Sequence, residues 1–100
     1  MIKDFKINVT ESELSLVKTK IKNYPWSSLQ DMDGWTLGTN KKYLKELCDY
    51  WIKDFNWKDH EKLINSFSNF KTRVDGIDIH FIEEKGSGKN PKPLLLMHGW

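Results

Sequence analysis

The chain has 100 residues, of which 16 are Lys or Arg and 14 are Asp or Glu, so its formal net charge is +2. With 38% hydrophobic and 13% aromatic residues, it has the composition of an ordinary soluble globular protein of one domain at most. The lone Cys48 excludes a disulfide framework and a cysteine-built zinc site. No apolar run approaches the ~18 residues of a membrane span, and residues 1–5 lack the apolar core of a signal peptide. We therefore expect a cytoplasmic or peripheral location.

The basic residues do not have the arrangement of a nucleic-acid interface. Arg73 is the single arginine of the sequence, and the lysines are scattered from Lys3 to Lys92 among acidic residues. A nucleic-acid footprint concentrates its cations in a stripe and favours arginine for bidentate contacts. We expect no nucleic-acid partner.

Residues 10–25 predict a first helix. Thr10 and Glu13 have the spacing of a capping box, which places the helix start at Glu11. Pro25 ends the helix. The apolar side chains that recur along one face between these limits are Leu14, Val17, Ile21 and Tyr24.

Residues 26–40 lack periodicity, which indicates a long connection. Asp31 and Asp33 in this connection are expected to be solvated. Four large apolar side chains are expected to hold the connection against its surroundings: Trp26, Leu29, Trp35 and Leu37.

Two further helices are predicted after this connection. Thr39 or Asn40 caps the second, and Asn56 caps a shorter third helix that reaches Ile64. We expect Trp51, at the centre of the widest apolar face, to anchor the packing of the helices against the sheet. The residues of that face are Leu44, Leu47, Cys48, Trp51 and Phe55.

After Asn65 the apolar period changes from that of a helix to that of a strand. Residues 70–74 and 77–81 alternate on either side of Asp75-Gly76, which is a type I′ turn signal, so we predict a β-hairpin. An earlier alternating run predicts that a first strand begins near Phe5. The members of that run are Phe5, Ile7 and Val9.

The last part of the chain predicts a loop and a buried strand. Residues 86–91 contain Gly-Ser-Gly-Lys, but they open no helix, so we favour a surface loop over a phosphate site. Residues 93–97 are apolar without alternation, which is typical of a strand covered on both faces of a parallel sheet. Because the sequence stops at Trp100, directly after that strand, we expect it to be the N-terminal part of a longer protein.

An apolar strand that runs into His98-Gly99-Trp100 is typical of the oxyanion loop of α/β-hydrolases. The hairpin just before it would supply the two preceding strands. Across nearly the whole chain the sequence resembles the N-terminal region of epoxide hydrolases of the microsomal and juvenile-hormone type. The other stretches that carry this resemblance are Trp35 and Gly38, 43–47, 50–51, 55–57, Glu61, 65–67, 70–72 and 74–82.

The resemblance implies an α/β fold in two parts. Residues 1–66 would form a helical N-terminal extension, and residues 67–100 the start of the catalytic domain, with the hairpin and the buried strand as the first strands of its sheet. It also implies an enzyme, with roles in detoxification or aromatic hydrocarbon catabolism. In this family an aspartate opens a small-molecule epoxide to an alkyl-enzyme ester, which a histidine-activated water hydrolyses to a diol, with two cap tyrosines on the epoxide oxygen and no cofactor or metal. Those groups would lie downstream of residue 100, so the chain alone would be inactive.

The resemblance places one part of that site on this chain. The backbone amide of Trp100 would donate to the oxyanion hole, and His98 and Gly99 would shape the loop. His98 as a general base is less consistent with the sequence, because no nucleophile elbow occurs in it.

The remaining candidates for chemistry have structural interpretations. We expect His60 on a solvated helix face, His80 in a packing role on the second hairpin strand, and Asp75 and Asp78 in their positions because of the turn. We expect the tryptophans to pack and not to bind bases or sugars.

Two alternatives remain open from the sequence. Another α/β-hydrolase, such as an esterase or a haloalkane dehalogenase, would share this start, and its nucleophile elbow would distinguish it. A free-standing helical interaction module would use its apolar faces and tryptophans to bind a partner.

Overall fold

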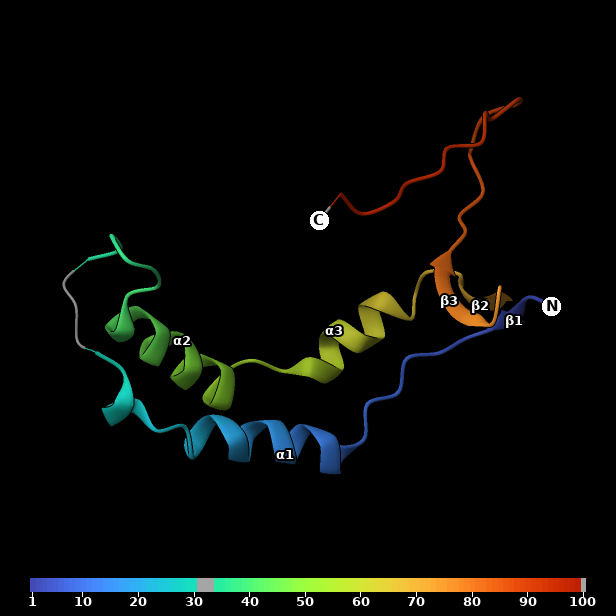
Figure 1. Cartoon of the computed structure of the whole chain (residues 1–100). Helices are drawn as coiled ribbons and strands as arrows, with labels where there is room; N and C mark the ends of the chain where they lie inside the picture. The colour runs from blue at the N-terminus through green and yellow to red at the C-terminus, as the bar shows by residue number, and fades with distance from the viewer. Residues whose placement is uncertain (31–33, 100) are drawn as a thin grey trace. The chain divides into compact units, whose positions relative to one another are not determined.

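The computed structural model describes residues 1–30 and 34–99. The chain divides into two compact units, which we call the helical unit (Ile7–Lys62) and the sheet unit (Met1–Lys6 and the chain from Leu63 onward). The elements follow in the order β1 (Lys3–Asp4), α1 (Glu11–Lys22), the 3-10 helix η1 (Trp26–Ser28), α2 (Lys41–Lys53), α3 (Trp57–Ile64), β2 (Asn69–Val74) and β3 (Ile77–Ile82) (Figure 1).

Helix α1 begins at the residue that the capping box predicts. The Thr10 side chain accepts a hydrogen bond from the Glu13 amide at 3.3 Å, and the Glu13 carboxylate accepts one from the Thr10 amide at 2.8 Å. These reciprocal bonds satisfy two donors that the end of a helix would otherwise leave unpaired. The helix ends at Lys22, before Pro25, as predicted.

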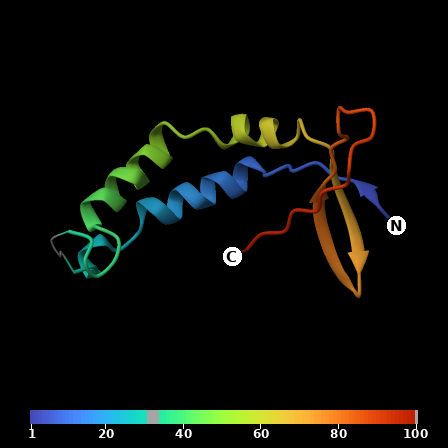
Figure 2. The same cartoon turned by 90° about the horizontal axis from the view of Figure 1, so that it is seen from above.

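Helices α2 and α3 are also capped by the predicted residues. The Asn40 side-chain oxygen accepts from the Tyr43 amide at 3.0 Å, and the Asn56 oxygen accepts from the Lys58 amide at 3.1 Å. Within the helical unit, α1 and α2 run antiparallel and side by side (Figures 1 and 2). The local signals at the three N-termini were therefore sufficient to place these helices.

The apolar face of α2 is only partly covered. Phe55 is half-buried and meets the Trp51 ring edge to face, with 6.5 Å between centroids. Trp51 itself is 44% exposed, so it is not buried within the helical unit, and its packing against the sheet stays a prediction. Trp51 lines a groove together with Leu14 and Val17 of α1.

The described part of the connection between η1 and α2, residues 29–30 and 34–40, forms no helix or strand, as predicted, but only some of the predicted apolar side chains hold it in place. Trp26 and Leu29 are half-buried, whereas Trp35 is 57% exposed and Leu37 is 75% exposed. Trp35 instead contacts the Tyr43 ring, with 5.1 Å between centroids. The predicted positions of Asp31 and Asp33 lie outside the described residues.

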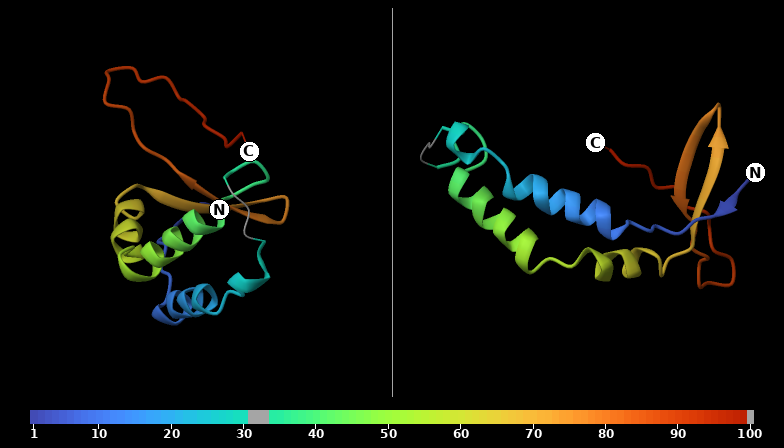
Figure 3. Two further views of the ribbon diagram at one scale, coloured as in Figure 1. Left: turned by 90° about the vertical axis from the view of Figure 1, so that its left-hand side faces the viewer. Right: turned by 90° about the horizontal axis from the view of Figure 1, so that it is seen from below.

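The sheet unit contains the predicted hairpin. Strands β2 and β3 pair antiparallel from Asn69↔Ile82 to Val74↔Ile77, and Figure 3 shows their tight connection. Asp75 and Gly76 both have positive φ, +50° and +83°, as a type I′ turn requires. Phe70 faces Phe81 across the strands, with 5.6 Å between ring centroids.

The first strand is displaced from its predicted start near Phe5. β1 consists of Lys3–Asp4 and pairs antiparallel with β2, which gives the sheet the order β1-β2-β3. The predicted alternation of covered and exposed side chains is present beyond the end of β1: Phe5, Ile7 and Val9 are half-buried, and the residues between them are exposed. The alternating segment is thus extended chain and not a longer strand.

The strand predicted at residues 93–97 is not formed in this structure. The chain from residue 83 to residue 99 contains no helix or strand, and the side chains of residues 94–97 are 81–82% exposed. A strand exists only where its N–H and C=O groups meet those of a neighbour. Within residues 1–30 and 34–99, the sheet ends at β3, so this segment has no partner strand.

Replacing Gly76 by Ala should destabilise the hairpin. A Cβ meets no atom within 4 Å there, but the φ of +83° places any L-residue in the left-handed region, at a cost of about 1–2 kcal/mol. Gly88→Ala is the matched control, because it has the same open surroundings without the positive φ. Thermal unfolding followed by circular dichroism should show a lower Tm for Gly76→Ala alone, and equal losses for both variants would contradict the turn assignment.

Candidate functional site

The predicted oxyanion motif lies at the end of the sheet unit. His98 and Gly99 are exposed and belong to the irregular segment that follows β3. Trp100, the predicted donor, lies outside the described residues. The roles assigned to His98, Gly99 and Trp100 therefore stay predictions.

The most constrained side chains of the structure are two polar ones, Glu61 at 8% exposure and Asn69 at 5%. No hydrophobic side chain in residues 1–30 and 34–99 is fully buried. A buried carboxylate or amide costs free energy unless hydrogen bonds satisfy it. We therefore describe the hydrogen-bond partners of Glu61 and Asn69 in turn.

Glu61 on α3 receives three hydrogen bonds within the helical unit. Its Oε2 accepts from the Val9 amide at 2.7 Å and from the Trp57 indole N–H at 3.0 Å. Its Oε1 accepts from the Lys58 ammonium at 3.0 Å. The Lys58 ammonium also donates to the Val9 carbonyl, so both backbone groups of Val9 are held by α3 side chains.

These contacts hold the pKa of Glu61 below its usual range. The backbone hydrogen bond from Val9 is the largest cause, followed by the side-chain bond from Lys58, while burial opposes them. The pKa of Glu13 is also lowered, chiefly by the side-chain hydrogen bond from Thr10. Both carboxylates are therefore in the ionised, hydrogen-bond-accepting form at neutral pH.

Asn69 is the buried, hydrogen-bonded polar residue of the sheet unit, as Glu61 is of the helical unit. Its Nδ2 donates to the carbonyls of Ile64 and Phe67, both at 2.8 Å, and its Oδ1 lies 2.9 Å from the Nε2 of His80. Since both Nδ2 contacts are to carbonyl oxygens, Oδ1 is the acceptor and His80 carries its proton on Nε2. The Phe5 amide donates to the Asn69 carbonyl at 2.9 Å.

Two histidines thus have packing contacts. The His80 ring also meets Phe5 edge to face, with 5.2 Å between centroids, and the Lys71 ammonium lies 3.8 Å from the centroid of Phe5. His60 stacks on Phe55 at 4.8 Å and is exposed. Within the described part of the chain, no three His, Cys, Asp or Glu side chains gather where a metal ion could bind.

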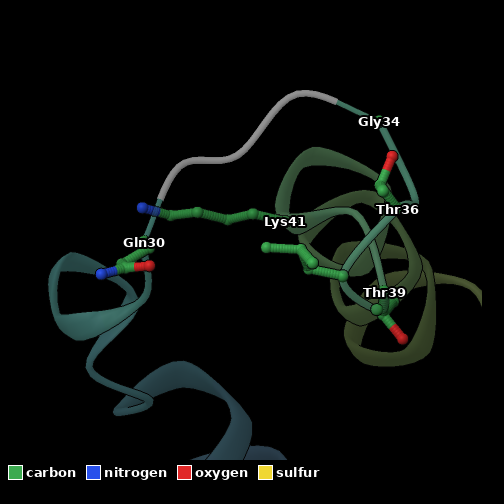
Figure 4. Close-up of a pocket in the computed structure, with 7 residues that line it drawn as sticks. Gln30, Gly34, Thr36, Thr39 and Lys41 are labelled. Atoms are coloured by element: carbon green, nitrogen blue, oxygen red, sulfur yellow. The ribbon is translucent and has the colours of Figure 1, made fainter.

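A cavity of about 380 Å³ lies in the connection before α2 (Figure 4). The Lys41 ammonium beside it donates to the Leu29 carbonyl at 2.9 Å, so this cation already has a backbone partner. No carboxylate or histidine belongs to the described lining. The lining consists of Gln30, Gly34, Thr36, Leu37, Gly38, Thr39 and Lys41.

The sequence did not reveal the roles of Glu61 and Asn69. The sequence places Glu61 on the predicted third helix beside Asp59 and His60, and this position gives no indication that its carboxylate is buried. A signal was present in the spacing, since Trp57 and Lys58 lie four and three residues before Glu61, and residues separated by three or four positions are neighbours on a helix face. Their backbone partner, Val9, is far away in sequence and could not be found from that spacing.

Comparisons with known proteins identify relatives of the whole chain. The family described as "Epoxide hydrolase N terminus" matches residues 2–100. Epoxide hydrolase 1 of Oryctolagus cuniculus is 35% identical over 103 residues, which covers 99% of this chain and 23% of that protein. Juvenile hormone epoxide hydrolase of Manduca sexta is 34% identical and is covered to 22% of its length.

Solved structures agree with these relatives. The crystal structure of juvenile hormone epoxide hydrolase from Bombyx mori superposes with a TM-score of 0.75 at 28% identity, over 82% of this chain and 20% of that one. Aspergillus niger epoxide hydrolase gives a TM-score of 0.64 at 23% identity, over 82% of this chain and 22% of that one, which supports the fold alone. The expected α/β-hydrolase type is thus confirmed. The chain spans less than a quarter of the length of these relatives.

Of the helices in the described residues, none has both the length and the apolar character needed to cross a bilayer.

The Glu61 contacts predict a pH dependence of stability. Because the folded-state pKa is lowered, Glu61 contributes stability that is present above its unfolded-state pKa of about 4.5 and is lost as the pH falls through the folded-state value. Thermal unfolding between neutral pH and about pH 2 should show a Tm difference between the original chain and Glu61→Gln that shrinks toward acid.

Glu46→Gln, at an exposed position of α2, is the control for removing a carboxylate in general. A Tm difference for Glu61→Gln that stayed constant over the whole pH range would mean that the charge of Glu61 does not matter.

Proposed function

Because the chain belongs to the epoxide hydrolase N-terminus family, we propose that it is the N-terminal part of an epoxide hydrolase of the α/β-hydrolase type. That enzyme would add water to an epoxide and release a diol. The observation that carries the proposal is the family match over residues 2–100, together with relatives named epoxide hydrolases that match 99% of the chain. The partner would be a small-molecule epoxide.

The proposed reaction passes through an ester between enzyme and substrate. A carboxylate opens the epoxide, and activated water then attacks the ester carbonyl. Attack places negative charge on the carbonyl oxygen, and a preorganised N–H donor stabilises this charge without having to reorient. The nucleophile, the base and the epoxide-polarising groups would be supplied by sequence beyond residue 100.

Trp100 would supply one of the donors through its backbone amide. The preceding residues, His98 and Gly99, would set the direction of that amide by shaping the loop. Gly99 has no atom within 4 Å of where a Cβ would lie, and its φ is not positive, so its proposed role rests on the family resemblance.

We propose the division into a helical extension, residues 1–66, and the start of the catalytic domain, residues 67–100. In this division α1, α2 and α3 belong to the extension, and β2 and β3 begin the catalytic sheet. A cytoplasmic location, or one peripheral to a membrane, is part of the same proposal.

The activity is tested by comparing the chain with a longer protein that contains it. With a simple aryl epoxide as substrate, the longer protein should form the diol, and residues 1–100 alone should form none, because they lack a matched nucleophile and base. Diol formation is followed by chromatography. An inactive longer protein, or one that hydrolyses only esters or haloalkanes, would contradict the proposed function.

The role of Trp100 is tested in that longer protein by Trp100→Pro, which removes the backbone N–H. The expected loss in kcat is about 100- to 1000-fold, the usual effect of deleting one oxyanion donor. Trp100→Phe keeps the amide and is the matched control, which should retain most of the activity. Equal activities of the two variants would exclude the amide as a donor.

A further inference from the structure

Both backbone groups of Val9 are bound by one pair of side chains on α3. The Val9 amide donates to Glu61 at 2.7 Å, and its carbonyl accepts from Lys58. Lys58 and Glu61 are three residues apart, so they lie on the same face of the helix, and they pair with each other at 3.0 Å. An extended residue normally has its N–H and C=O paired by a neighbouring strand, and here an ion pair takes that place.

Apolar burial contributes only part of the same attachment, because no apolar side chain of this segment is fully buried. Ile7 and Val9 are half-buried, while Asn8 and Thr10 are exposed. The carboxylate of Glu61, in contrast, is almost completely enclosed, with a side-chain exposure of 10%. Segments with few buried apolar contacts open at low free-energy cost, and their closed state depends on the specific bonds that remain.

We propose that residues 7–10 form a strap that opens from α3 as a local unit, and that the carboxylate of Glu61 is the latch that keeps it closed. The latch works through charge, because the ionised carboxylate accepts from three donors at once: an amide, an indole and an ammonium. An amide side chain of the same size has one acceptor oxygen. Its NH2 group would face either the Lys58 ammonium or the other two donors.

Two neighbouring backbone amides make the proposal testable. The Val9 amide is bound by Glu61, whereas the next amide, that of Thr10, is bound by Glu13 of the capping box at 2.8 Å. Hydrogen exchange of the full chain, measured residue by residue by NMR, therefore reports on two carboxylates separately.

Glu61→Gln should lower the protection of the Val9 amide about 10- to 100-fold, while the Thr10 amide, which keeps its Glu13 acceptor, and amides in the middle of α1 and α2 change by less than about threefold. Glu13→Gln is the matched control: it should expose the Thr10 amide and leave Val9 protected. Lys58→Gln, which removes the other half of the pair, should also lower the protection of Val9.

Three results would overturn the proposal. Unchanged exchange at Val9 in Glu61→Gln would show that the carboxylate is not the latch. An equal loss of protection throughout α1 and α2 in both Glu61→Gln and Lys58→Gln would show global unfolding and not local opening. Absence of protection at Val9 in the original chain would show that the closed strap is not populated.

Discussion

The helical unit depends on one buried carboxylate. Glu61 binds the backbone of Val9, the indole of Trp57 and the ammonium of Lys58, and it thereby joins the segment that precedes α1 to α3. Removing a charged acceptor from such a site leaves partly buried donors without that partner, which costs free energy. Most small domains have fully buried hydrophobic side chains at their centre. The described residues of this chain have none, and in the helical unit the buried residue is Glu61 with its hydrogen-bond donors.

The sheet unit also has a buried, hydrogen-bonded polar side chain, but here it is the uncharged Asn69. Asn69 uses both amide hydrogens on the carbonyls of Ile64 and Phe67 and uses its oxygen on His80. It thereby fixes the turn after α3 at the point where β2 begins. In each unit one buried polar side chain forms its hydrogen bonds with backbone groups and with nearby side chains of the same unit. These bonds have a structural role.

The sequence predicted the elements whose signals are local. The capping box of Thr10 and Glu13, the caps Asn40 and Asn56, and the Asp75-Gly76 turn all act within a few residues, so the starts of three helices and the hairpin were correct. Interactions between distant residues were not visible in the same way. Glu61 finds its partner 52 residues away, and an acid among charged neighbours gives no sign of burial.

The prediction of a strand at residues 93–97 was wrong for a related reason. Its apolar composition describes the surroundings that a strand prefers, but a strand also needs a neighbour, which this structure does not provide. The candidate catalytic motif had no physical signal of its own beyond its place after that segment. The resemblance to a family therefore carried the functional prediction, and the comparisons over residues 2–100 support it at the level of the family.

The absence of a fully buried hydrophobic side chain in residues 1–30 and 34–99 determines how the free energy of unfolding varies with temperature. The heat-capacity change of unfolding grows with the apolar surface that becomes exposed and decreases with the polar surface. In this chain much apolar surface is already in water before unfolding, while Glu61 and Asn69 add polar surface when they are released. The curve of unfolding free energy against temperature is therefore flatter than that of a domain with a hydrophobic core. Cooling destabilises the fold little, because hydrogen bonds and ion pairs contribute much of its stability.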